Sequence, residues 1–425
     1  MATVTYLKAR QILDSRGTPT VEADMRLDNG NICRASVPSG ASTGSYESVE
    51  LRDKDKNKFN GKGVLKAIEN INSIISKEIK NKEFQTINEF DSFLINLDGT
   101  DNKSKIGANA ILACSMAFMK CSASNMNKEI YEFLNPDGPY LLPTPLMNII
   151  NGGAHANNGL DIQEFMIVPA GFDTFSESLR AGVEIFMSLK QILEKKNYST
   201  AVGDEGGFAP DLKSNQDALE LISISIKDAG YKLGEEVYLA LDVAASEICT
   251  NKKYKIDGNL LLPDELIEYY KNLCKKYPII SIEDPIHEDD WSNWSNLTSQ
   301  IGDHVQIVGD DLFVTNEARL NRGIEEKAGN SILVKINQIG SISETIDTIN
   351  LANSNNFSYI VSHRSGETED STISDIAVGT KSGQIKTGSC SRTDRTSKYN
   401  QLIRIEEFLG DKAGFAKLST FHQKL

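Results

Sequence analysis

The sequence predicts an α/β protein in which a parallel (β/α)8-type barrel follows a smaller α+β domain. Residues 238–365 contain five apolar runs, and each ends at a polar or charged residue that an ordinary core would exclude. Amphipathic segments of helix length separate the runs. This alternation is typical of a parallel barrel, whose strand C-termini face one mouth and supply catalytic groups. A chain of 425 residues has room for a barrel of about 250 residues and one more domain.

The smaller domain is expected to occupy residues 1–134. Its first part shows short extended runs separated by turn signals such as Asp28-Asn29-Gly30, which predicts an antiparallel meander. Its second part repeats apolar residues at helical spacing. We therefore expect strands within 3–7, 18–27 and 31–37, followed by helices within 63–79, 83–97 and 106–134.

The segment PSGASTGSYES, residues 38–48, connects the meander to these helices and is rich in Gly, Ser and Thr. Composition alone favours a flexible surface loop. The alternative is an active-site lid, in which Ser39, Ser42 and Thr43 offer hydroxyl groups to a phosphate or a metal. Both interpretations remain open on the residues of this segment.

The barrel domain is expected over 135–425, after a proline-rich junction at 135–145. Its first two runs, MNIIN and QEFMIVP, are predicted to be strands on either side of a loop that carries His155. Gln163 and Glu164 open the second run. A helix is expected over 175–196.

The run TAVGDEGGFAP follows that helix and carries Asp204 and Glu205 before two glycines. We interpret it as the end of a further barrel strand, which would bring the acidic pair to the mouth. The last units are a short strand within 383–388, ending near Lys386, and a helix over 394–409.

Three acidic residues at strand ends predict a metal site. Asp242, Glu283 and Asp310 each follow an apolar run. Carboxylates gathered at one mouth repel each other strongly unless a cation lies among them. Oxygen ligands of this kind suit a hard divalent cation, and Mg²⁺ is the leading choice.

Cationic residues at the same strand ends predict an anionic substrate with a carboxylate or phosphate group. Lys335 and Lys386 lie near the ends of their runs, and Arg364 follows another. Repulsion between these cations should lower their pKa values, so that one lysine could be neutral near pH 7 and act as a base. Lys335, beside the acidic residues, is the candidate.

Bulk properties exclude several classes of function. The chain carries 45 basic and 59 acidic residues, a net charge of −14, which argues against general nucleic-acid binding. The six cysteines form no CxxC pair and are expected to be reduced thiols. No signal peptide and no apolar run of membrane-spanning length are found, so a cytoplasmic protein is expected.

Taken together, ten segments make the chain resemble the enolase family. They occur in the family's order between about residues 4 and 409, and no matched catalytic position is replaced: LDSRGTPTVE, SGASTG, NGGAHANNGLDIQEFM, GDEGGFAP, LDVAASE, SIEDP, GDDLFVTN, KINQIGS, SHRSGETED and IKTG. The resemblance implies an N-terminal α+β domain and a barrel that starts β-β-α-α with one antiparallel strand. It also implies reversible dehydration of 2-phosphoglycerate to phosphoenolpyruvate in glycolysis and gluconeogenesis. A Lys base beside one or two Mg²⁺ ions is the established arrangement in this superfamily.

The resemblance also assigns roles to individual residues. Metal ligands fall on Asp242, Glu283 and Asp310, with Ser42 reaching a second Mg²⁺. The base falls on Lys335, the general acid on Glu205 and a supporting carboxylate on Glu164, while His155 lies on a closing loop. Substrate contacts fall on Gln163, Arg364, Ser365 and Lys386. The segment GSCSRTDRTSKYNQ departs from the usual family pattern at Ser389, Cys390 and Ser391 beside this rim.

Two other functions remain open at this point. A related barrel enzyme, such as a racemase or a sugar-acid dehydratase, would share the three carboxylates. The other is a non-enzymatic binding role at the cell surface, which the protein would reach without a signal peptide. The C-terminal lysine that is usually invoked for such binding is not the last residue here. The family suggests a homodimer or a ring of dimers.

Overall fold

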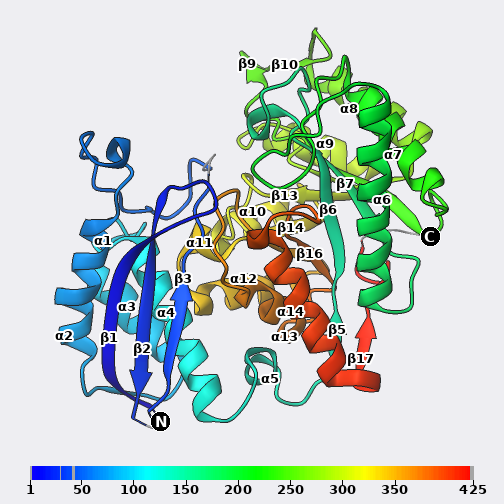
Figure 1. Cartoon of the computed structure of the whole chain (residues 1–425). Helices are drawn as coiled ribbons and strands as arrows, with labels where there is room; N and C mark the ends of the chain where they lie inside the picture. The colour runs from blue at the N-terminus through cyan, green and yellow to red at the C-terminus, as the bar shows by residue number, and fades with distance from the viewer. Residues whose placement is uncertain (1, 29, 41–43, 422–425) are drawn as a thin grey trace.

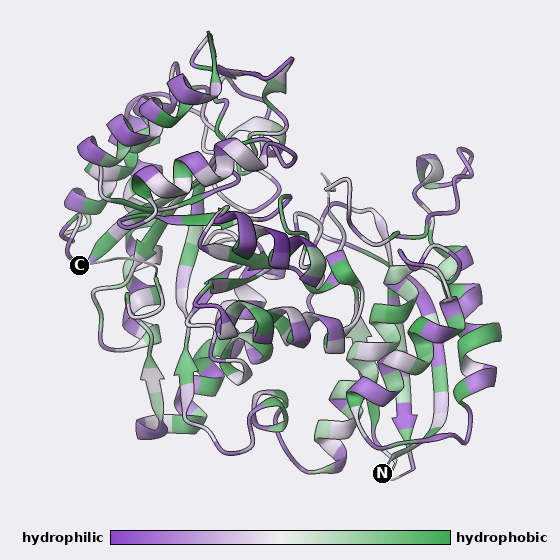
Figure 2. Ribbon diagram, turned by 180° about the vertical axis from the view of Figure 1, so that it is seen from behind, coloured by the Kyte–Doolittle hydropathy of each residue, from purple (hydrophilic) through white to green (hydrophobic). Residues whose placement is uncertain are grey.

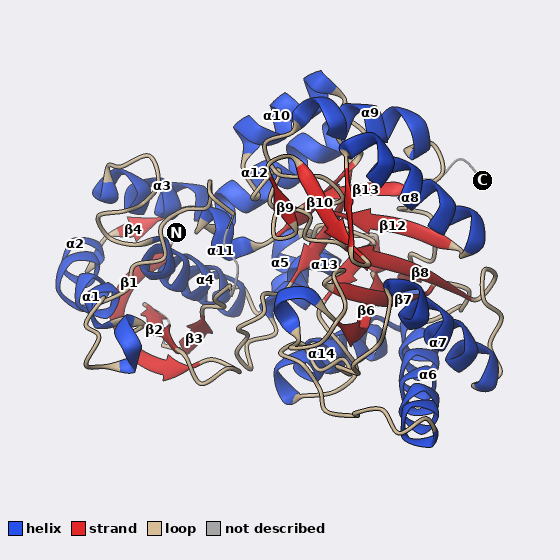
Figure 3. Cartoon of the chain, turned by 90° about the horizontal axis from the view of Figure 1, so that it is seen from above, coloured by secondary structure: helices blue, strands red, loops and turns tan. Residues whose placement is uncertain are grey.

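The computed structural model describes residues 2–28, 30–40 and 44–421. In Figure 1 the small sheet and its helices lie on the left, and the larger barrel and its helices lie on the right. Figure 3, seen from above, shows the barrel strands surrounded by helices, with the smaller unit beside them. The predicted α/β class and the closed eight-stranded barrel are confirmed.

The small sheet is the predicted antiparallel meander. It consists of β1 (Ala2–Leu13), β2 (Pro19–Leu27) and β3 (Ile32–Ser36), in the order β3-β2-β1-β4, and the short β4 (Glu83–Phe84) pairs with β1. Alternate residues of β2 (Val21, Ala23 and Met25) are fully buried. A strand directs successive side chains to opposite faces, so this alternation defines the face that packs against the helices.

The helices of this unit follow the predicted segments with one break. They are α1 (Leu65–Glu69), a π-helical segment (Asn70–Ile75), α2 (Ser76–Ile79), α3 (Ile87–Asp98), α4 (Ala108–Asn125) and α5 (Ile130–Leu134). The segment 106–134, which was expected to be helical, therefore forms two helices with a break between them. Asn127 adopts a left-handed conformation, with φ 52°, which an α-helix of L-residues cannot continue through.

The barrel strands include all five runs of 238–365. The barrel is formed by β6 (Thr144–Asn151), β7 (Glu164–Pro169), β8 (Val237–Asp242), β12 (Ile279–Glu283), β13 (Gln306–Gly309), β14 (Ser331–Val334), β15 (Ser358–Ser362) and β16 (Gln384–Lys386). Strand β7 runs antiparallel to both β6 and β8, and the other neighbours are parallel. The antiparallel strand that the family resemblance implied is thus present.

Helices cover the outside of the barrel in sequence order. They are α6 (Phe175–Lys195), α7 (Asn215–Asp228), α8 (Pro263–Lys276), α9 (Trp291–Ile301), α10 (Glu317–Glu326), α11 (Ile336–Ile339), α12 (Ile342–Ser354), α13 (Thr372–Gly379) and α14 (Thr393–Leu409). Hydrophobic and hydrophilic colours alternate around the outer helices in Figure 2, as expected for helices with one buried face. None of the described helices is long and apolar enough to cross a membrane.

Two small sheets complete the fold, and the strand–helix pattern did not predict them. Between β8 and α8 lies an antiparallel sheet of β9 (Cys249–Thr250), β10 (Lys253–Ile256) and β11 (Asn259–Leu261). Strand β5 (Tyr140–Leu142) pairs with β17 (Ala413–Phe415) near the end of the chain. Strands this short carry too few residues for a clear alternating pattern.

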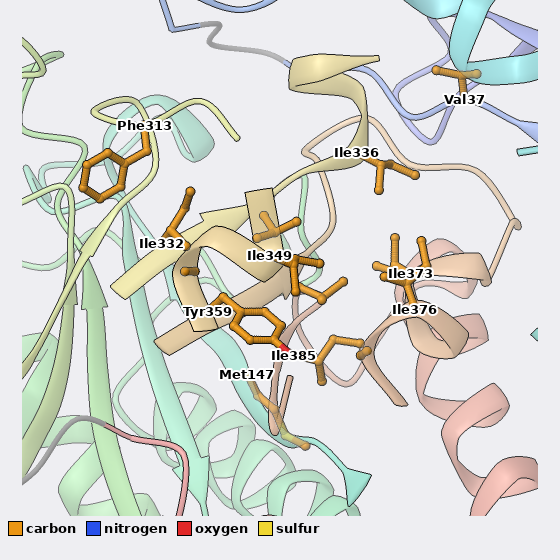
Figure 4. Packing of buried hydrophobic residues seen from close by; sticks show 14 of the residues in the cluster. Val37, Met147, Phe313, Ile332, Ile336, Ile349, Tyr359, Ile373, Ile376 and Ile385 are labelled. Atoms are coloured by element: carbon orange, nitrogen blue, oxygen red, sulfur yellow. The ribbon is translucent and has the colours of Figure 1, made fainter. Parts of the chain in front are cut away.

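Apolar side chains fill two spaces around the barrel wall. Between strands and helices, Ile332, Tyr359 and Ile385 face Ile349 of α12 and Ile376 of α13 (Figure 4). Inside the barrel, a separate cluster closes the interior: Leu146, Met166, Val168, Ala240, Ile280, Val308, Leu333 and Ile360. The packed wall and interior hold the strand ends in fixed positions, and those ends carry the candidate site.

Candidate active site

The three predicted metal-ligating carboxylates lie together at the barrel mouth. Asp242 and Glu283 end the neighbouring strands β8 and β12 and are register partners, and Asp310 directly follows β13. All three are buried. Burial raises the pKa of Glu283 well above its usual range, and the charges of Asp242 and Asp310 reinforce the shift. A positive charge nearby would stabilise the ionised form of this carboxyl group.

Lys386 supplies positive charge to this cluster. Its Nζ lies 3.0 Å from Asp242 Oδ2, 2.8 Å from Glu283 Oε2 and 3.2 Å from Glu164 Oε2. Burial opposes protonation, but Asp242, Glu164 and Glu283 together hold the pKa of Lys386 well above its ordinary value. The lysine is therefore an ammonium ion that takes part in the acidic cluster.

Lys335 pairs with the third carboxylate. Its Nζ donates a hydrogen bond to Asp310 Oδ2. Burial lowers the pKa of Lys335, and repulsion from Arg364 adds to this effect. The charges of Asp310 and Glu283 together outweigh both, so that the pKa of Lys335 is raised. The sequence-based expectation of a neutral lysine near pH 7 is therefore wrong for the protein by itself, because the nearest charge is a carboxylate.

Gln338 and Thr315 fix the positions of Asp310 and Lys335 through hydrogen bonds. Gln338 Nε2 donates to Asp310 Oδ1 at 2.8 Å, and Thr315 Oγ1 donates to Gln338 Oε1 at 2.7 Å. The backbone N–H of Lys335 in turn donates to Thr315 Oγ1 at 2.9 Å. Because every link is a directed hydrogen bond, the carboxylate and the ammonium group have little freedom to move apart.

A second acidic group adjoins the cluster and was not predicted. Asp284, Asp310 and Asp311 bring carboxylate oxygens close enough to share a cation. Asp284 accepts hydrogen bonds from the backbone N–H groups of Asp310 and Asp311, each at 2.9 Å. Burial, with the charge of Asp310, raises the pKa of Asp311 to about 8. The doublets Glu283-Asp284 and Asp310-Asp311 were the sequence signal for this group.

Glu164 and Glu205 form an acid pair in the same cavity. Because β7 runs against its neighbours, its first residue, Glu164, lies at the mouth as the register partner of Asp242. Burial, with repulsion from Glu205, raises the pKa of Glu164 well above its usual range. Asn148 Nδ2 donates to Glu205 Oε2 at 3.1 Å. Two buried carboxylates this close titrate as a unit, so one proton belongs to the pair.

Glu205 lies in the cavity on a loop, and not at the end of a barrel strand as predicted. The segment around it is not a barrel strand, because only isolated bridges at Val202 and Phe208 flank it. It is a loop between α6 and α7 whose tight backbone approach requires glycine, since a Cβ on Gly207 would lie 2.7 Å from the carbonyl oxygen of Asn148.

Two histidines flank this acid pair. His155 Nδ1, from the short 3₁₀ turn Gly153–His155, lies 3.6 Å from Glu164 and 3.8 Å from Glu205. His363 was given no role from the sequence, and its Nε2 lies 3.4 Å from Glu205. Arg395 donates to His363 Nδ1, so the ring proton must lie on Nε2, toward Glu205. Burial lowers the pKa of His363 to about 3.

Arg364 and Ser365 lie just beyond β15 and connect the barrel to the small sheet unit. Arg364 Nη1 donates to both carboxylate oxygens of Glu47, at 3.0 and 3.1 Å, and Arg16 Nη1 donates to Ser365 Oγ at 3.3 Å. Gln163 Nε2 lies 3.4 Å from Asp242 Oδ2. Sequence reasoning missed Glu47 because its partner is 317 residues away.

One cavity collects most of the predicted site residues. Ten of them line it: His155, Gln163, Glu164, Glu205, Asp242, Asp310, Lys335, Arg364, Ser365 and Lys386. Glu283 is not in the lining set and contacts Lys386. Ser42 and Thr43 lie outside the described residues, so the lid interpretation of 38–48 stays a prediction.

An eight-stranded barrel with acidic residues and lysines at one mouth defines an enzyme of the barrel class with a site that could hold a metal ion. Comparison with protein-family models extends this assignment over both parts of the chain. Residues 4–134 match the enolase N-terminal domain, and residues 139–424 match the enolase C-terminal TIM barrel domain. The chain belongs to the enolase family. Membership implies a lyase of the enolase superfamily.

Replacing Lys386 tests the charge balance at the mouth. Lys386→Met leaves Asp242, Glu283 and Glu164 without their shared ammonium partner, and breaking a buried ion pair costs about 3–5 kcal/mol. Thermal unfolding followed by circular dichroism should show a clearly lower Tm, partly restored by millimolar Mg²⁺. The exposed Lys381→Met is the matched control and should melt like the parent. Equal Tm values for Lys386→Met and the parent would contradict this account.

His363 should make stability depend on pH. Its folded-state pKa of about 3 lies below the unfolded value of about 6.5. The unfolded chain therefore binds the extra proton between these values, so the contribution is full above pH 6.5 and is lost as the pH falls toward 3. The loss is at most about 1.4 kcal/mol per pH unit. In His363→Gln, Tm should fall less steeply between pH 6.5 and 4.5, and an unchanged slope would exclude the buried neutral imidazole.

Proposed function

We propose that this chain catalyses the reversible dehydration of 2-phospho-D-glycerate to phosphoenolpyruvate and water, the glycolytic and gluconeogenic reaction, in the cytoplasm. The observation that carries the proposal is one cavity holding Lys335 beside Asp310 together with the acid pair Glu164–Glu205. Elimination of water needs a base for the carbon-bound proton and an acid for the departing hydroxyl group. The family acts on small phosphorylated substrates, and Arg364 and Lys386 supply the matching positive charge.

The oxygen donors fit magnesium. Asp242, Glu283 and Asp310 offer only carboxylate oxygens, are buried, and are paired with the ammonium groups of Lys335 and Lys386. These three residues would hold the ion, and Ser42 would reach a second one. When bound, Mg²⁺ supplies positive charge for the substrate's carboxylate, which gains negative charge as the neighbouring carbon loses its proton.

The residues of the chain then take separate roles in the reaction. Lys335 can accept the carbon-bound proton only once its ion pair with Asp310 is relieved, because that pair keeps the pKa of Lys335 raised. The Glu164–Glu205 pair holds one proton, which rests on Glu164 because the pKa of Glu164 is raised and that of Glu205 is lowered. Glu205 passes this proton on to the leaving hydroxyl group. His363 remains neutral and directs its Nε2 proton toward Glu205, while His155 closes the other side of the pair.

Arg364, Ser365, Gln163 and Lys386 bind and orient the anionic substrate in this scheme. Glu47 now engages the Arg364 guanidinium, which holds it in a fixed orientation at the cavity. We assign residues 1–134 to a domain that carries the lid 38–48, and residues 135–425 to the catalytic barrel. A homodimer, or a ring of dimers, is the proposed assembly.

Magnesium dependence is the first test. Purified protein should convert 2-phosphoglycerate to phosphoenolpyruvate, followed by ultraviolet absorbance, and a strong chelator should remove the activity until Mg²⁺ is restored. Matched hydroxy acids without the phosphate group should not react. Activity that survives chelation would refute the metal role, and reaction with the unphosphorylated acids alone would favour a related dehydratase or racemase.

Isotope exchange separates the base from the acid. Lys335→Ala should abolish exchange of the carbon-bound proton with solvent deuterium, read by NMR, because it removes the base. Glu205→Gln should retain exchange but lower water loss by roughly 10²–10⁴-fold. Exchange that persists in Lys335→Ala would move the base to another residue, and loss of exchange in Glu205→Gln would overturn the division of roles.

A further inference from the structure

A pair of cysteines far from the catalytic cavity meets between the small sheet and α4. Cys33 lies in β3 and is the register partner of Met25 in β2, so the two side chains project from the same face of the sheet. Met25 is fully buried on that face. Cys33 therefore points toward α4, but its place in the edge strand β3 leaves it only half-buried.

Cys121 approaches from the helix. It lies in α4, is buried, and its Sγ donates to the carbonyl oxygen of Met25 at 3.2 Å. The same Sγ lies 3.9 Å from the carbonyl oxygen of Asn31, two residues before Cys33. The two thiols are close enough to shift each other's pKa. Strand pairing and helix packing thus bring one accessible and one buried sulfur together.

The surroundings activate Cys33 in particular. It lines a surface groove together with Arg34, Lys120 and Lys128. The hydrogen bond from Cys121 and the charge of Lys120 lower the pKa of Cys33 to about 7 against the opposing effect of burial. By contrast, burial raises the pKa of Cys274 to about 12. The thiolate is the reactive form of cysteine, so Cys33 is distinguished by geometry, access and charge together.

We propose that Cys33 and Cys121 form a peroxide-sensitive dithiol, with Cys33 as the attacking thiol and Cys121 as the resolving thiol. The Cys33 thiolate attacks hydrogen peroxide, forming an S–O bond while the O–O bond breaks and hydroxide leaves. The sulfur is oxidised by two electrons and the peroxide is reduced. The Cys121 sulfur then attacks the sulfenic acid, forming the disulfide, and its proton leaves with the hydroxyl group as water.

The disulfide would join the edge strand β3 to α4. After β3 the chain reaches Ser39, which pairs with Gly366 beside the catalytic cavity. The bond would therefore fix the strand that leads into the stem of the segment 38–48. Neither cysteine lines the catalytic cavity, so oxidation of this pair can be tested separately from the dehydration reaction.

Peptide mapping by mass spectrometry tests the proposal on the intact chain. Native protein treated with a small excess of hydrogen peroxide and then alkylated should yield a Cys33–Cys121 disulfide peptide that dithiothreitol removes. Without peroxide, iodoacetamide at pH 7 should label Cys33 at least ~10-fold faster than Cys274. In Cys121→Ser, dimedone should trap a sulfenic acid at Cys33, whereas Cys33→Ser should give neither product.

Cys114→Ser is the matched control, since Cys114 lies on the same helix and is fully buried. It should leave the disulfide unchanged. Labelling of Cys33 no faster than that of Cys274, or peroxide treatment of the parent protein that leaves Cys33 and Cys121 unlinked, would overturn the proposal. Both measurements, of the labelling rate and of the disulfide, use the parent protein and so do not depend on the folding of any variant.

Discussion

Electrostatic balance at the barrel mouth is the constraint on which the rest of the site depends. Carboxylates of Asp242, Glu283 and Glu164 are buried around a single ammonium group, that of Lys386. An unpaired buried charge is so costly that a protein would rather change its protonation state than keep it. The raised pKa values of Glu164 and Glu283 are the consequence. The site therefore has more acidic groups than its lysines can satisfy, which is the condition under which a further cation binds favourably.

The reversed direction of β7 allows that balance to include an acid. In a uniformly parallel barrel the first residue of the second strand would lie at the closed end. Here Glu164, the first residue of β7, lies beside Asp242, the last residue of β8. The loop that carries Glu205 then folds over the same end and completes the acid pair. A single antiparallel strand thus brings Glu164, whose pKa is raised, beside the other acidic groups of the mouth.

The small sheet unit contributes contacts that the barrel does not make alone. Ser39 and Gly366 exchange two backbone hydrogen bonds, of 2.8 and 2.9 Å. A Cβ on Gly366 would lie 2.7 Å from the carbonyl oxygen of Ser39, so this close approach requires glycine. Glu47 reaches Arg364, and Arg16 reaches Ser365. Both parts of the chain therefore build the cavity, and the position of the segment after β3 affects the contacts of Arg364 and Ser365.

The sequence by itself determined the strand–helix alternation, the small meander and the strand-end residues Asp242, Glu283 and Asp310, because periodicity and chain order are local properties. The same strand-end pattern gave Lys335 and Lys386, and the ten motifs added the expected roles of these lysines and of the acid pair. Only the tertiary structure decided that Lys386 is surrounded by carboxylates, that Asp310 raises the pKa of Lys335, and that Glu47, Gln338, His363 and Arg395 support the cavity. The physical reason is that charge interactions depend on distance in space and on burial, and partners such as Glu47 and Arg364 are brought together by folding alone.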